Sequence, residues 1–279
     1  MVEVKKDYKR FFPSVMDRAY EQSKKFRLVK DIMSTTVIKI PLSETMDKAA
    51  KVMGTEHIGS LIVTENGSDI GIITERDLLT GVLARGRKLS DVKVREVTST
   101  PLISITPDAT IKEAAQTMIK KRGRLAVSVG NKIVGVVTAS DLIKSIPDTS
   151  DTLLRVESLM TRELETADEK TTVMNVVKVM GAKRVGSVII TKKGEPFGIF
   201  TERDLLTGLL AVEKSLEIQV GKVASSPLIT APSWISVHEA ASIMSNKHIR
   251  RLPLTAEENQ MNLVGIITAR DLVEAYARD

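Results

Sequence analysis

The sequence Gly71-Ile-Ile-Thr-Glu-Arg-Asp-Leu-Leu79 occurs in four related copies along this chain of 279 residues. The other copies begin at Gly135, Gly198 and Gly265, so neighbouring copies are 64, 63 and 67 residues apart. Self-similarity at a nearly constant spacing is the signature of a repeat architecture. In each copy two apolar residues precede a Thr, and apolar residues at helical spacing follow an Asp three positions later. The Thr is therefore predicted to lie where a buried strand passes into a helix.

The residues before each copy follow one plan. In the first repeat, residues 37–40 and 59–64 are apolar enough for strands, and Asn66-Gly67 is a strong hairpin signal. Ser43 can cap a helix over residues 44–53, whose apolar residues form one stripe. The order strand–helix–strand–strand–helix predicts an α/β (α+β) fold built from four such units. Their predicted spans are 30–84, 93–146, 156–211 and 220–277.

Repeats one and three resemble each other most, and so do repeats two and four. Residues 201–208 repeat residues 74–81 letter for letter, and Ser226-Pro-Leu-Ile229 matches Thr100-Pro-Leu-Ile103 closely. This pattern predicts two paired modules, 30–146 and 156–277, that arose by duplication. The polar stretch 147–155 is predicted to be the linker between them.

The composition narrows the class of protein. The chain has no Cys, so disulfides and thiolate metal sites are impossible. No apolar run approaches the roughly 20 residues that a membrane helix needs. The three His residues lack metal-ligand spacing, and neither a nucleophile elbow nor a P-loop is present. We expect a cytoplasmic protein that is not an enzyme, does not contact a membrane and requires no cofactor.

The basic character is concentrated before the repeats. Residues 1–30 contain nine Lys or Arg and four acidic residues, and they include five of the nine aromatic residues. Basic and aromatic residues together are typical of a nucleic-acid-binding arm. An amphipathic helix over about residues 13–27, packed by its aromatics against the repeats, fits the same composition. The extension 1–29 is therefore open to both interpretations.

Over residues 30–277 the chain resembles the cystathionine-β-synthase (CBS) domain family, whose repeats pair in Bateman modules. The resemblance is carried by the unit order and by four copies of Gly-φ-φ-Thr-x-x-Asp-φ in register, where φ is apolar. It implies a regulatory protein that senses an adenosyl ligand such as AMP, ADP, ATP or S-adenosylmethionine. It also implies a disc of paired modules, formed either within one chain or by a homodimer. The alternative function is an interaction scaffold, or a nucleic-acid-associated regulator that acts through residues 1–29.

In the CBS family, which this chain resembles, the Asp of each motif binds ribose hydroxyls and the Thr lies near ribose and phosphate. An ionised Asp can accept two hydrogen bonds from a vicinal diol, and a helix N-terminus favours phosphate. The segment before the partner repeat's first strand frames the base. The implied motif pairs are Thr74 and Asp77, Thr138 and Asp141, Thr201 and Asp204, and Thr268 and Asp271. The implied framing residues are Thr36, Val37, Pro101, Leu102, Leu164, Pro227 and Leu228.

Arginines distinguish the four predicted clefts. Arg250 and Arg251 are candidate phosphate clamps, which makes the Asp271 cleft the first choice for a phosphorylated ligand. Arg124 makes the Asp141 cleft the second choice. In the odd repeats, Arg76 and Arg203 could replace the missing clamp. Two alternatives remain: each Thr-x-x-Asp could serve only as a helix cap, and the acidic segment 161–165 could favour a less charged ligand such as S-adenosylmethionine.

Overall fold

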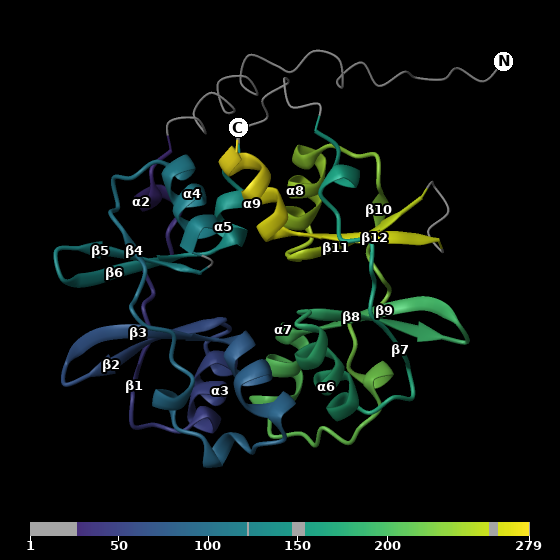
Figure 1. Cartoon of the computed structure of the whole chain (residues 1–279), viewed down its shortest axis with the longest axis horizontal. Helices are drawn as coiled ribbons and strands as arrows, with labels where there is room; N and C mark the ends of the chain where they lie inside the picture. Colours follow the sequence, from purple (N-terminus) through teal and green to yellow (C-terminus); the bar gives the residue numbers. More distant parts are fainter. Residues whose placement is uncertain (1–26, 122, 147–153, 257–261, 279) are drawn as a thin grey trace.

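The computed structural model describes residues 27–121, 123–146, 154–256 and 262–278 (Figure 1). The predicted N-terminal extension, apart from its last residues, and most of the predicted linker lie outside the described residues. The rest consists of four similar units of three strands with flanking helices. The mixed α/β fold with four repeats is therefore confirmed.

The first two repeats have the predicted order of elements. Repeat 1 contains α2 (Val29–Ile32), β1 (Lys39–Pro41), α3 (Met46–Thr55), β2 (Ser60–Glu65), β3 (Ser68–Thr74), η2 (Asp77–Val82) and η3 (Leu83–Arg85), with η4 (Leu89–Asp91) and η5 (Val94–Glu96) in the connection that follows. Repeat 2 contains β4 (Ser104–Ile105), α4 (Ile111–Lys121), β5 (Leu125–Val129), β6 (Lys132–Val137) and α5 (Ala139–Ile143). In each sheet the first strand is parallel to the second, and the second pairs with the third as an antiparallel hairpin.

The second half of the chain repeats this arrangement. Repeat 3 contains η6 (Val156–Ser158), β7 (Thr166–Asp168), α6 (Val173–Lys183), β8 (Ser187–Lys192), β9 (Glu195–Thr201), α7 (Glu202–Leu205) and η7 (Leu206–Leu210). Repeat 4 contains η8 (Val220–Lys222), β10 (Ala231–Pro232), α8 (Val237–Asn246), β11 (Arg251–Thr255), β12 (Leu263–Thr268) and α9 (Ala269–Arg278). The strand pairing is the same as in the first half.

The start of the first long helix differs from the prediction. Thr45, not Ser43, caps α3, because its hydroxyl accepts a hydrogen bond from the backbone N–H of Lys48 at 3.2 Å. A cap of this kind satisfies a backbone donor that has no partner within the helix. The helix thus begins two residues later than the sequence pattern indicates. Its predicted apolar stripe is nevertheless fully buried.

Within each half of the chain the two sheets lie against each other. Ser34 bridges to Val136 and Ile72 bridges to Ser99, so the segment before each first strand crosses to the other repeat's third strand. Equivalent bridges join repeats 3 and 4, at 161 with 266 and at 199 with 225. The loop before one repeat therefore lies beside the strand-to-helix junction of its partner.

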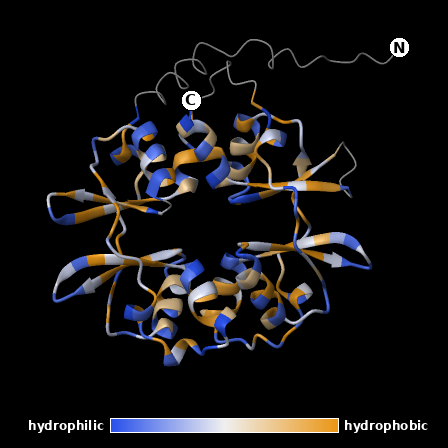
Figure 2. Cartoon of the chain, viewed as in Figure 1, coloured by the Kyte–Doolittle hydropathy of each residue, from blue (hydrophilic) through white to orange (hydrophobic). Residues whose placement is uncertain are grey.

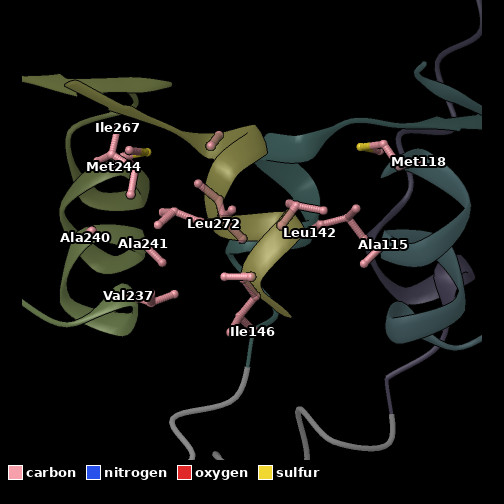
Figure 3. Packing of buried hydrophobic residues seen from close by; sticks show 14 of the residues in the cluster. Ala115, Met118, Leu142, Ile146, Val237, Ala240, Ala241, Met244, Ile267 and Leu272 are labelled. Atoms are coloured by element: carbon pink, nitrogen blue, oxygen red, sulfur yellow. The ribbon is translucent and has the colours of Figure 1, made fainter. Parts of the chain in front are cut away.

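The two halves meet through their helices. One apolar core combines α4 and α5 of repeat 2 with α8 and α9 of repeat 4, and a second core combines the helices of repeats 1 and 3. Figure 3 shows Leu142 of α5 and Leu272 of α9 between α4 and α8. Orange, hydrophobic stretches run along the strands and through both helix groups in Figure 2. Burying these apolar helix faces is the main favourable term that joins the repeats into a ring within one chain.

Candidate functional site

A Thr and an Asp form the same hydrogen-bonded pair at the strand-to-helix junction of every repeat. In each pair, one carboxylate oxygen, Oδ2, accepts both the backbone N–H and the hydroxyl of the Thr. The donor–acceptor distances lie between 2.7 and 2.9 Å in Thr74–Asp77, Thr138–Asp141, Thr201–Asp204 and Thr268–Asp271. The motif is therefore a helix cap in all four copies, and the cap uses only one oxygen of each carboxylate.

The second carboxylate oxygen distinguishes the four sites. The hydroxyl of Ser225 donates to Oδ1 of Asp204 at 2.8 Å, so that acceptor is already occupied from the partner repeat. Within the described part of the chain, no hydrogen bond reaches Oδ1 of Asp141 or Asp271. Burial raises the pKa of Asp77, and the hydrogen bonds from Thr74 only partly oppose this shift. Oδ1 of Asp77 also accepts no hydrogen bond from the described residues, so Asp141 and Asp271 are set apart because each of them lines a cavity.

Asp141 faces a cavity of about 310 Å³. Thr138 and Asp141 line it, and so does Thr36 of the partner repeat, which the CBS resemblance implied would face Asp141. Ile38 and Ile62 contribute apolar surface. The volume lies within the usual range for small-molecule sites, which combine apolar walls with a few polar groups.

The second half of the chain completes this cavity. Arg203, His248 and Arg250 line it from repeats 3 and 4, opposite the residues of repeats 1 and 2. Altogether four Lys or Arg side chains and one carboxylate line it, which gives a net charge of +3 with His neutral. Buried Glu75, which pairs with Arg203 and Arg250, offsets part of this charge, and the remaining excess of cations still favours an anionic ligand.

Asp271 faces a larger cavity of about 800 Å³. Thr268 lies beside it, and Leu164 of the partner repeat also lines the cavity. Glu163 and Glu165 line the same side, and six arginines and six carboxylates line the cavity in total. Its net charge is therefore zero, in contrast to the Asp141 cavity.

Two buried glutamates hold arginines between the cavities. Glu75 is 5% exposed and pairs with Arg203 at 3.1 Å and with Arg250 at 3.6 Å. Glu202 is 8% exposed and pairs with Arg76 at 3.0 Å and with Arg251 at 2.8 Å. We call these six residues, together with Arg124, the hub.

The arginines of the hub tie the two halves of the chain together. Besides its ion pair, Arg203 donates to the carbonyl of His57 at 3.0 Å. In the same way, Arg76 donates to the carbonyl of Arg184 at 3.4 Å. Each odd repeat therefore sends an arginine across to the other odd repeat. The hub arginines of the odd repeats are structural ties as well as residues that line a cavity.

Glycines leave space for the hub side chains where the hub meets the second strand of the odd repeats. A Cβ atom at Gly59 would collide with the carboxylate of Glu75 and the guanidinium of Arg124. At Gly186, a Cβ would collide with the guanidinium of Arg251. Arg124 donates to the carbonyl of Gly59, and burial lowers the pKa of its guanidinium, an effect that Glu75 opposes. The missing side chains thus make room for charged groups.

The remaining predicted site residues lie in two environments. Val37 and Leu102 pack against the apolar contact between the sheets of repeats 1 and 2, whereas Thr36 lines the Asp141 cavity. Pro101 and Pro227 are exposed, and Leu228 is partly buried. Side chains alternate along an extended segment, which is why Thr36 and its neighbour have different surroundings.

Sequence reasoning missed the role of Glu75 and Glu202. Their partners lie more than 100 residues away, at Arg203 for Glu75 and at Arg76 for Glu202, where no local pattern in the sequence links them. It also missed the apolar residues Ile38 and Ile62 in the cavity. Ile38 could have been predicted to line the cavity, because residues two apart on an extended segment point to the same side and Thr36 was already a candidate.

Neither a metal centre nor a membrane span is found among the described residues. No group of three or more His, Cys, Asp or Glu side chains there could hold a metal ion. None of the described helices combines the length and apolar character required to cross a bilayer.

Comparison with known proteins gives the family. The model of the CBS domain matches residues 29–84, 94–148, 156–211 and 220–278. The chain belongs to the CBS-domain family. Its four matches coincide with the four Thr–Asp units described above.

Its relatives include bacterial and archaeal proteins. YhcV of Bacillus subtilis (strain 168), a CBS domain-containing protein, is 35% identical over 115 residues, which are 41% of this chain and 81% of YhcV. MJ1225 of Methanocaldococcus jannaschii is 28% identical over 198 residues, 64% of this chain and 68% of that protein. The crystal structure of MJ1225, proposed to be an archaeal homologue of g-AMPK, has a TM-score of 0.71 at 22% identity and covers 90% of this chain and 100% of that one. A Pyrococcus horikoshii structure, with a TM-score of 0.60 at 22% identity, has the same coverage. These structures support the fold, and none of these relatives is named as an enzyme.

Proposed function

We propose that this CBS-domain protein is a non-catalytic regulatory protein that binds a phosphorylated adenosyl ligand in the Asp141 cavity. AMP, ADP and ATP are the candidate ligands. The observation that carries the proposal is the cavity itself, where an open carboxylate oxygen of Asp141 and a net charge of +3 occur together. A nucleotide needs both an acceptor for its diol and cations for its phosphate.

The lining residues support a specific orientation of the ligand. The ribose hydroxyls would donate to Oδ1 of Asp141, while Oδ2 keeps its contacts with Thr138. The base would lie against Ile38 and Ile62. The phosphate would bind Arg250, whose ion pair with Glu75 at 3.6 Å is the longest in the hub. An arginine that is loosely held can form a shorter, charge-assisted contact with phosphate.

The sequence led us to expect a phosphorylated ligand first in the Asp271 cleft and second in the Asp141 cleft, and this proposal reverses that preference. The Asp271 cavity contains the predicted Arg250 and Arg251, but Arg251 is committed to Glu202 at 2.8 Å. Glu163 and Glu165 line that cavity and would repel an additional phosphate there. For the Asp271 cavity we therefore propose an adenosyl group with less negative charge, such as S-adenosylmethionine. The MJ1225 relative, as a proposed g-AMPK homologue, is in keeping with nucleotide sensing.

Thermal unfolding with AMP, ADP, ATP and S-adenosylmethionine tests the proposal. A ligand at 100 times its dissociation constant should add about 2.7 kcal/mol of stability. Asp141→Ala should abolish the stabilisation by the phosphorylated ligands. Asp204→Ala is the matched control, because it removes the same cap from a carboxylate whose second oxygen is already occupied by Ser225. Stabilisation by AMP, ADP or ATP that survives in Asp141→Ala, or no stabilisation by any of these three compounds, would contradict the proposal.

A further inference from the structure

The surface formed by residues 83–96 and helix α6 is strongly basic. Residues 83–96, which include η3, η4 and η5, contact α6 where Ala84 faces Gly181, and they contact the start of α3 where Lys93 forms a β-bridge with Thr45. Figure 1 shows α3 and α6 next to each other in the lower part of the ring. Residues 83–96 contain five basic and two acidic residues, and α6 adds two lysines, which gives a net charge of +5.

The equivalent surface on the other side of the contact between repeats 1 and 3 has no net charge. Ala211 faces Gly54 there, so residues 210–222 and 46–56 correspond to residues 83–96 and 173–183. These two segments contain four basic and four acidic residues. The same fold is therefore built without the excess of positive charge, and the charge is not a requirement of the helix packing.

A pair of equivalent lysines shows how the two surfaces differ. Lys51 of α3 is held by Asp47 at 3.1 Å and by Glu213. The positions beside Lys178 that correspond to these acids hold a methionine and a glycine. Five exposed cations on this side form no ion pair with any described residue, and we call them the belt: Arg85, Lys88, Lys93, Arg95 and Lys178.

The belt is separate from the site described above. None of its residues lines the Asp141 cavity or the Asp271 cavity, and none belongs to the hub. Four of the five lie within eleven consecutive residues, where their like charges repel one another. A bound polyanion would relieve this repulsion.

Two features of the surface indicate which kind of polyanion fits. Val179, 37% exposed, is the only exposed large apolar side chain that the structure describes in these two segments, so the surface lacks the cluster of anchors typical of a protein interface. Neither segment contains an aromatic residue on which an unpaired base could stack. A row of cations without such groups suits the closely spaced phosphates of a double helix.

We propose that the belt binds the phosphate backbone of a double-stranded nucleic acid. Contacts with phosphates position a protein on a duplex without reading its sequence, so the binding is independent of sequence. The belt lies within the repeats and is distinct from the basic extension 1–29. The inference goes beyond the proposed function and does not depend on it.

Fluorescence polarisation of labelled DNA and RNA duplexes with the full chain tests the proposal. The logarithm of the affinity should fall with the logarithm of the salt concentration, with a slope of about −0.9 for each phosphate bound. The double variant Lys88→Glu with Lys178→Glu should make this slope shallower by about 2 and weaken binding at least about tenfold. Lys214→Glu with Lys222→Glu is the matched control, because it makes the same change of charge on the equivalent surface, and it should keep the slope. All four lysines are exposed, so both double variants should unfold at the same temperature as the unchanged protein.

The outcomes separate the belt from other binding surfaces and other partners. Equal duplex binding by the two double variants would overturn the proposal and assign the binding to residues outside the belt. The absence of duplex binding at low salt would overturn it as well. Tighter binding of a single strand than of its duplex, or binding of poly-L-glutamate in place of either duplex, would replace the proposed partner with a single strand or an acidic protein. These assays contain no AMP, ADP or ATP, so their result leaves the proposed function at Asp141 untouched.

Discussion

The helices of repeats 1 and 3 cross so closely that two glycines leave no room for a methyl group. Gly54 of α3 lies against Ala211, and Gly181 of α6 lies against Ala84. A Cβ atom added at either glycine would lie less than 3.0 Å from the Cβ of the facing alanine, a separation that real Cβ atoms essentially never show. Gly181→Ala should therefore force apart the helices that join the two halves of the chain.

The expected change in stability of Gly181→Ala follows from two opposing effects. Alanine is favoured over glycine in a helix by about 1 kcal/mol, so a change without a clash should be neutral or stabilising. Overpacking a well-filled core costs about 1–3 kcal/mol. The added methyl would lie 3.6 Å from the Cα of Ala84, so no side-chain rotation can relieve the clash. We expect Gly181→Ala to be less stable by about 1–3 kcal/mol than a matched Gly→Ala change without a clash.

Gly208 of η7 is the site of the matched control substitution. It belongs to the helical segment that packs in the same core, and an added Cβ there meets no atom within 4 Å. Urea unfolding of Gly181→Ala, Gly208→Ala and the double variant Gly181→Ala with Ala84→Gly measures the difference. The double variant moves the methyl to the facing helix and should recover most of the steric loss. Equal stability of the Gly181→Ala and Gly208→Ala variants would refute the close crossing of repeats 1 and 3.

Three further predictions concern buried polar groups. Ser145 is 1% exposed and its hydroxyl has no hydrogen-bond partner among the described residues, so Ser145→Ala should stabilise the fold by about 1 kcal/mol in urea unfolding; a clear loss would mean that the hydroxyl is bonded. Burial raises the folded-state pKa of Asp77 above 3.8, so the folded state holds its proton to higher pH than the unfolded chain does, and stability falls as pH rises through that window. Asp77→Asn should remove this slope in unfolding measured from just below pH 3.8 upward, and a pH profile parallel to that of the unchanged protein would count against the shift. Arg251→Ala leaves Glu202 with one arginine and should lower the free energy of unfolding by about 2 kcal/mol. Arg87→Ala breaks an ion pair at the surface and should change that free energy little. Equal effects of the two substitutions would show that the hub does not stabilise the fold.

Much of the fold could be predicted because its signals are local. The strand-to-helix junctions follow from apolar pairs before a Thr and helical spacing after an Asp, and the structure confirms the junctions at Thr74, Thr138, Thr201 and Thr268. The stripe of α3 was predicted for the same reason. Its start was predicted two residues early because Ser43 and Thr45 are both good caps. Only the three-dimensional path of the chain selects between them.

The site was predictable only in part. The pairing of Asp141 with Thr36, and of Asp271 with Leu164, was expected from the CBS resemblance, and each pair lines one cavity. The difference between the carboxylates was not predictable. It depends on Ser225, a single hydroxyl that comes from the partner repeat and occupies Oδ1 of Asp204. Nothing in a period of about 65 residues encodes such a contact.

The sequence by itself determined the repeat unit, the number of repeats and the four Thr–Asp junctions, because each of these depends on neighbours within a few residues. Only the tertiary structure decided that repeat 1 packs its helices against repeat 3, and repeat 2 against repeat 4. That choice brings Arg203 and Arg250 to a cavity formed around Asp141 in the other half of the chain. Charges far apart in the sequence, such as Glu75 and Arg203, leave no periodic trace, since their attraction depends on distance in space and not on distance along the chain.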